Sequence, residues 1–202
     1  MNPITRPLSV AVFLSVLSIL PLVSRAEGPV ASDDFSGSAL SEKWNVAKGT
    51  WTITDGKLKG VELASDKHAA VATYVAPHTN SKVKFSFQLA GSDGFQLSFN
   101  HEKGHLFRVI VTSKDATLTT DKDKKDPASK AVQLCKVEGA FEQGKTYTVT
   151  CETKGDSVSV EFDNSVKLSG SDPSLATKKT GYRLVVKGGG VLFDDFAVLS
   201  LE

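Results

Sequence analysis

Apolar and polar residues alternate along most of this chain. The period of two is clearest in VKFSFQL, FQLSF, SVSVEF and VLFDDFAVL, and the helical period of 3.6 is almost absent. These segments are rich in Val, Phe, Tyr and Thr, which suit a pleated, half-buried surface. Turn-forming residues separate them about every ten positions, a spacing typical of an all-β sandwich or barrel. The pattern therefore predicts an all-β fold.

The same alternation predicts which side chains face the core. The expected inward rows are Val83, Phe85, Phe87 and Leu89; Phe95, Leu97 and Phe99; and Val158, Val160 and Phe162. Two facing sheets share one core about 10 Å thick, and such rows would fill it. Trp44 and Trp51 are expected to cap this core near its amino-terminal end. A platform on which sugars stack is the alternative role for each.

Local signals also predict the turns. Asp55-Gly56 lies between WTIT and KLKGVEL, and a type I′ hairpin turn needs positive φ at both central residues. Asp163-Asn164 is a second signal of this kind. The only helix candidate is a single turn over Ser38 to Lys43.

The first 26 residues have the features of an export signal. Arg6 precedes an apolar run from Leu8 to Val23, and Ser24-Arg25-Ala26 fits the cleavage rule for signal peptides. The run is shorter than the roughly 20 apolar residues that span a bilayer, although an uncleaved anchor is the alternative. We therefore expect a signal peptide over residues 1–26 and a single domain over residues 27–202. The mature protein would be secreted or periplasmic, with no membrane attachment after cleavage.

The overall charge does not point to a polyanionic partner. Without Arg6 and Arg25, 22 basic residues remain against 23 acidic ones, a net charge of −1. This balance gives no electrostatic reason to expect a nucleic acid partner.

The chain has two cysteines, Cys135 and Cys151. An even pair in an exported protein indicates one disulfide. If VQLCKV and YTVTCET are the arms of one hairpin that turns near Gln143, the two residues lie opposite one another, within bridging distance. Two buried thiols are the alternative.

Motifs at both ends carry a family resemblance. DDFSG, a following Trp, GTWTITDGKL, SVSVEFDNS and VLFDDFAV resemble the concanavalin A-like lectin and glucanase superfamily. Within it, the chain is most similar to secreted bacterial domains of the 3-keto-disaccharide hydrolase type, also labelled family 16 glycoside hydrolase-like. The resemblance covers Asp33 to Leu199. It implies a two-sheet antiparallel jelly-roll sandwich, concanavalin A-like or laminin G-like, whose first and last strands are adjacent.

The resemblance also bears on catalysis. The laminarinase-like branch uses an E-x-D-x-E strand motif, because a retaining glycosidase needs two carboxylates about 5–5.5 Å apart. The only near match is Glu161-Phe162-Asp163, where the final acid is replaced by Ser165, or by Val166 in the longer form E-x-D-x-x-E. This incomplete motif argues against ordinary glucanase activity. His105 and Glu102 are the weaker candidates for a general acid and base.

Four aspartates form a candidate metal site. Adjacent first and last strands would bring Asp33 and Asp34 close to Asp194 and Asp195, and carboxylate oxygens suit calcium. Turn-capping and solvated aspartates are the alternative. A structural calcium is thus the only metal that the sequence points to, and no cofactor is required.

Polar side chains alternate with the inward rows and form a candidate ligand surface. The outward positions are Lys84, Ser86, Gln88, Gln96, Ser98, Asn100 and Arg108. The amides of Gln88, Gln96 and Asn100 and the guanidinium of Arg108 could satisfy sugar hydroxyls, although a solvated sheet face has the same composition.

The leading hypothesis is a secreted, non-catalytic carbohydrate-binding or carbohydrate-associated module, with an oligo- or polysaccharide as partner. The alternatives are a glycoside-acting hydrolase of the 3-keto-disaccharide type and a structural or interaction module of the cell envelope.

Overall fold

The computed structural model describes residues 29–123 and 125–201, so the predicted signal peptide lies outside the described residues. The strands are β1 (Ala31–Asp33), β2 (Trp44–Lys48), β3 (Thr50–Thr54), β4 (Lys57–Val61), β5 (Ala70–His78), β6 (Ser81–Leu89), β7 (Gly94–His101), β8 (Gly104–Thr112), β9 (Asp115–Thr120), β10 (Gln133–Glu138), β11 (Thr146–Lys154), β12 (Ser157–Phe162), β13 (Lys167–Ser171), β14 (Lys179–Val186) and β15 (Val191–Ser200). Two short 3₁₀ helices, η1 (Ala64–Asp66) and η2 (Pro173–Ala176), complete the described elements. Within these ranges, no helix is long and apolar enough to cross a membrane.

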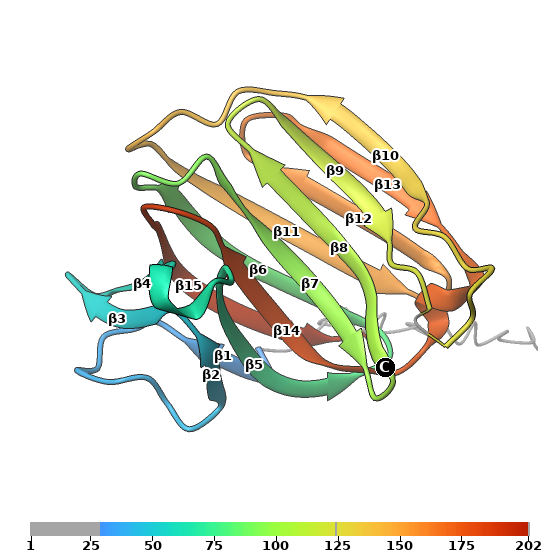
Figure 1. Ribbon diagram of the computed structural model, residues 1–202, viewed down its shortest axis with the longest axis horizontal. Helices are drawn as coiled ribbons and strands as arrows, with labels where there is room; N and C mark the ends of the chain where they lie inside the picture. The colour runs from blue at the N-terminus through green and yellow to red at the C-terminus, as the bar shows by residue number, and fades with distance from the viewer. Residues whose placement is uncertain (1–28, 124, 202) are drawn as a thin grey trace, which may run out of the picture.

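The strands form two antiparallel sheets that pack face to face. Sheet 1 has the order β13-β12-β11-β6-β15-β4-β3, and β1 pairs with β15 at its side. Sheet 2 has the order β10-β9-β8-β7-β14-β5-β2. Figure 1 shows β7, β8 and β14 of sheet 2 drawn across β6, β11 and β15 of sheet 1. The fold class is therefore as predicted, and the first strand is next to the last.

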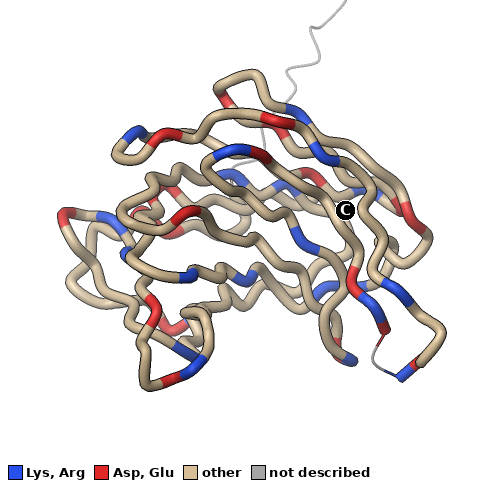
Figure 2. Tube along the Cα trace, turned by 45° about the horizontal axis from the view of Figure 1, so that its top comes forward, with Lys and Arg blue, Asp and Glu red and all other residues tan. Residues whose placement is uncertain are grey.

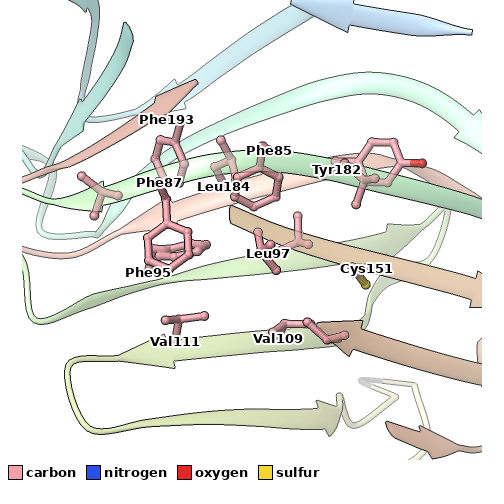
Figure 3. Packing of buried hydrophobic residues seen from close by; sticks show 14 of the residues in the cluster. Phe85, Phe87, Phe95, Leu97, Val109, Val111, Cys151, Tyr182, Leu184 and Phe193 are labelled. Atoms are coloured by element: carbon pink, nitrogen blue, oxygen red, sulfur yellow. The ribbon is translucent and has the colours of Figure 1, made fainter. Parts of the chain in front are cut away.

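The core lies between the two sheets and contains the predicted inward rows. Every residue of these rows is at most 4% exposed. Figure 3 shows Phe85 and Phe87 of sheet 1 in the same interior as Phe95 and Leu97 of sheet 2. The alternation of side chains along each strand thus places these residues correctly.

The two tryptophans belong to the core. Trp44 is 6% exposed and makes edge contacts with the rings of Tyr74 and Phe196. Trp51 is 8% exposed and stacks on Phe193, with ring centroids 6.2 Å apart. Neither indole is available as an exposed platform for a sugar.

The turn predictions have different outcomes. Asp55 and Gly56 have φ of 51° and 70° and join β3 to β4, as expected for a type I′ turn. In the β12–β13 turn, the left-handed residue is Ser165 at φ 73°, so this turn is longer than the two residues predicted. Residues 38–43 form bends and turns, and the predicted helical turn is absent there.

The predicted disulfide is wrong. Cys135 lies on β10 opposite Leu118 in sheet 2, whereas Cys151 lies on β11 between Val83 and Val160 in sheet 1. Both are free thiols. The two segments are not arms of one hairpin, because the chain passes from one sheet to the other between them.

The two thiols should differ in reactivity. Cys151 is 1% exposed, and burial raises the pKa of its thiol to about 12. Since the thiolate is the reactive form, Cys151 should resist alkylation in the folded protein, while half-buried Cys135 reacts. Thiol titration should find one fast-reacting cysteine in the native state and two after unfolding, without a reductant. Thiols that appear only after reduction would contradict this arrangement.

A candidate ligand-binding face on sheet 2

The outward face of sheet 2 is polar at its centre. On β7, Phe95, Leu97 and Phe99 point into the core, so Gln96, Ser98 and Asn100 take the outward positions. The strand pairing extends this outward row in both directions. One row runs Asn45, Thr73, Arg183, Ser98, Arg108, Thr119 and Gln133 across β2, β5, β14, β7, β8, β9 and β10. We call the outward surface of Gln96, Ser98, Asn100, Arg108 and Arg183 the polar face.

Arg108 is held in place by its neighbours. Its Nε donates a hydrogen bond of 3.1 Å to Asp121, and its Nη2 forms an ion pair with the same carboxylate. Its Nη1 donates to the Gln96 side-chain oxygen at 3.2 Å. A guanidinium that binds a carboxylate through two nitrogens has a fixed orientation. The Gln96 amide is therefore oriented as well, with its oxygen toward Arg108.

Arg183 lies on the other side of Ser98 and was not identified from the sequence. In the pairing of β14 with β7, Arg183 is opposite Ser98, and Ser98 is opposite Arg108 on β8. Ser98 is only 3% exposed although it faces outward, as expected for a small residue between two arginines. The available signal was the alternation of Tyr182, Arg183 and Leu184. It shows that Arg183 faces outward, but not which strand lies beside it.

Next to this row, the surface is hollowed. Val185, Gln96 and Ile110 form the neighbouring outward row, two residues from the first row on each of the three strands. These residues line a hollow of about 440 Å³ whose rim includes the loops at Gly91–Gly94 and at Lys187 and Gly188. A hollow with an apolar floor and a few oriented polar groups is the usual form of a small-ligand site.

One predicted ligand residue lies elsewhere. Gln88 is on β6 of sheet 1, so it shares no face with Gln96, Asn100 and Arg108 of sheet 2. Its amide donates a hydrogen bond to the Gly144 backbone oxygen. The expectation of one polar row that includes Gln88 is wrong, because β6 and β7 follow each other in the chain but belong to opposite layers.

The candidate acid and base residues do not share a cavity. His105 Nδ1 is 3.0 Å from the Asn100 side-chain oxygen, at the end of the polar face. His105 lines a hollow together with Asp121 and Asp172, whereas Glu102 is exposed on the β7–β8 turn and lines a different hollow.

The two carboxylates of the incomplete glucanase motif, Glu161 and Asp163, have protein partners. Lys167 forms an ion pair with Glu161 at 3.0 Å, and the Thr148 amide donates to Asp163 at 3.0 Å.

Three of the four aspartates, Asp33, Asp34 and Asp194, have protein partners for their carboxylates. Asp33 accepts hydrogen bonds from Trp44 Nε1 at 3.0 Å and from Ser41 Oγ at 3.1 Å. Asp194 forms an ion pair of 2.9 Å with Lys57. Within the described ranges, no three His, Cys, Asp or Glu side chains lie together as metal ligands would. Calcium binding remains a prediction.

Asp34 and Asp195 have local roles. The Asp34 carboxylate accepts from the Ser36 hydroxyl and amide, and these hydrogen bonds lower its pKa. Asp195 adopts a left-handed conformation at φ 52°, inside the irregularity where β15 shifts its pairing with β6. Both residues thus shape turns or bulges near the β1–β15 edge.

Solved structures with the same two-sheet arrangement are numerous. The chain superposes on the carbohydrate-binding module CBM66 from Bacillus subtilis with a TM-score of 0.64 and 13% identity, covering 78% of this chain and 96% of that one. It matches porphyranase B from Zobellia galactanivorans with a TM-score of 0.61 and 10% identity, covering 84% and 91%. It matches SCLam, a family GH16 endo-β-1,3(4)-glucanase, with a TM-score of 0.58 and 12% identity, covering 84% and 89%.

The chain has the concanavalin A-like jelly-roll fold. At these identities, the likeness shows the fold alone. No protein-family model and no curated protein matches the sequence. The function therefore has to be argued from the site.

Proposed function

We propose that this protein binds a saccharide on the polar face of sheet 2. The observation that carries the proposal is the arrangement of oriented amide and guanidinium groups on adjacent strands, next to a hollow with an apolar floor. Sugars present hydroxyls that pair with such groups and C–H surfaces that pack on apolar side chains. The structural neighbours described above, a carbohydrate-binding module and two glycan-cleaving enzymes, support this ligand class. The amino-terminal segment supports export, so the glycan would lie outside the cytoplasm.

Gln96→Ala should weaken saccharide binding. Gln96 lies between Val185 and Ile110 at the hollow, and its oxygen is fixed by Arg108, so its amide nitrogen is positioned for a ligand oxygen. Loss of one such hydrogen bond should reduce affinity roughly 3- to 10-fold. The measurement is calorimetric titration of the purified protein with the glycan that gives the strongest signal on an array.

Gln88→Ala is the matched control, because it removes the same amide from the opposite face of the sandwich. It should leave affinity unchanged. Equal losses in the two variants would show that the polar face is not the binding surface. An array on which no glycan binds would overturn the proposed function itself.

A further inference from the structure

Arg183 has a positive charge that no described residue neutralises. Its nearest outward neighbours, across and along the strands, are Val71, Thr73, Val75, Gln96, Ser98, Asn100, Gly181 and Val185. None of these residues is acidic. Within residues 29–123 and 125–201, Arg183 forms no ion pair, and its Nε–H is shielded from solvent without a hydrogen-bond partner.

This environment costs folding free energy. Arg183 is half-buried, and burial lowers the pKa of its guanidinium, although an arginine keeps its charge at neutral pH. A shielded N–H donor without an acceptor is rare in native proteins and calls for an explanation. An anionic oxygen from outside the protein would satisfy the donor and offset the buried charge together.

Arg108 provides an internal comparison. It lies on the same face, one strand beyond Ser98, and the side chain of Asp121 neutralises it. These two are the only arginines in residues 27–202. Both occupy the polar face, but in the described part of the chain Arg108 has an acidic partner and Arg183 has none.

The positive charge is local. The net charge of residues 27–202 is −1, and Figure 2 shows acidic and basic residues interspersed along the chain. A general attraction for polyanions is therefore not expected. Any preference for an anion would arise from Arg183 and from the donors beside it, Ser98 and Thr73.

We propose that the saccharide bound on the polar face carries an anionic group, the carboxylate of a uronic acid or a sulfate ester, and that Arg183 binds it. This inference rests on the proposed function, because it names the class of glycan for the same face. Both groups offer two oxygens at the spacing that a guanidinium recognises. The hollow beside Gln96 would hold the neighbouring, uncharged part of the ligand.

The experiment starts from an array that displays uronic acid-containing, sulfated and neutral oligosaccharides. The strongest ligand is then titrated by calorimetry beside a counterpart in which the carboxylate is reduced or the sulfate removed. We expect the anionic form to bind at least tenfold more tightly, as for a charge-assisted hydrogen-bonded pair. A loss of affinity on reduction of the carboxylate identifies a uronate ligand. A loss of affinity on removal of the sulfate identifies a sulfate ester.

Arg183→Gln should abolish the difference in affinity between the anionic and neutral forms, and this difference, measured within the one variant, is the readout that reports on Arg183. Arg183→Lys keeps the charge but not the planar pair of donors, so it should retain only part of the difference. Lys84→Gln is the control, because it removes one positive charge from an exposed outward position of sheet 1. Thermal unfolding of each variant checks that it is folded.

The outcomes separate the two proposals. If neutral glycans bind as tightly as anionic ones, or if Arg183→Gln retains the preference for the anionic form, the inference about Arg183 is overturned and the saccharide function stands. If no glycan of any class binds, the saccharide function is overturned as well.

Discussion

Phe87→Ala is expected to lower the free energy of unfolding by about 3–5 kcal/mol. Phe87 is 1% exposed on β6, near the centre of sheet 1. Its ring lies 4.7 Å from that of Phe95 in sheet 2, measured between centroids. It also contacts Phe141 and stacks on Tyr147. Truncation would leave a cavity at a contact between the layers, where rigid aromatic neighbours have little freedom to fill it.

Urea unfolding of the purified variant measures this loss. Lys84→Ala on the same strand is the matched control, because Lys84 faces outward and is exposed. Surface substitutions of this kind usually change stability by about 0.5 kcal/mol or less. A loss below about 1 kcal/mol for Phe87→Ala would contradict its place between the sheets.

The second large effect concerns Lys179 and pH. Lys179 is fully buried at the start of β14, where its ammonium donates to the backbone oxygens of Thr79 at 2.9 Å and Leu175 at 2.5 Å. It has no ion pair with a described residue. Burial lowers the pKa of its ammonium from 10.5 to about 8. The folded protein therefore releases this proton at a lower pH than the unfolded chain does.

The sign of the pH dependence follows. Between pH 8 and 10.5, the unfolded chain binds more protons at this lysine, so the contribution of Lys179 to the free energy of unfolding rises with pH. From pH 7 to pH 10 the expected rise is about 2–3 kcal/mol.

Cys151 and Tyr182 lower the free energy of unfolding as pH rises, opposite to Lys179. Burial raises the pKa of Cys151 to about 12 and also raises that of Tyr182, so both favour the unfolded state once the unfolded chain ionises.

The difference between the wild type and Lys179→Met isolates the lysine. Cys151 and Tyr182 are present in both proteins, so their contributions cancel to first order. The stability of the wild type relative to this variant should increase as pH rises from 7 to 10 in urea unfolding experiments. Lys178→Met, which removes the exposed lysine beside it, is the control for the loss of one charge. A difference that stays flat over this range would contradict the buried position of Lys179.

Some features of the site were accessible from the chain before its fold was known. Gln96, Asn100 and Arg108 are outward residues of neighbouring strands in the structure, as the alternation predicted. Arg183 completes the polar face, but it lies on β14, which pairs with β7 although the two strands are far apart in the sequence. No local signal specifies such a partner.

The sequence by itself determined the strands with the clearest alternation, the inward rows of β6, β7 and β12, and the β3–β4 hairpin. These properties are local, because side chains alternate along any strand and a two-residue turn needs positive φ at its own residues. Only the tertiary structure decided which strands share a sheet. That choice separated Gln88 from Gln96, placed Cys135 and Cys151 in opposite sheets, and brought Arg183 beside Ser98. Strand order depends on how two whole sheets bury their apolar faces together, a property of the complete core and not of any one segment.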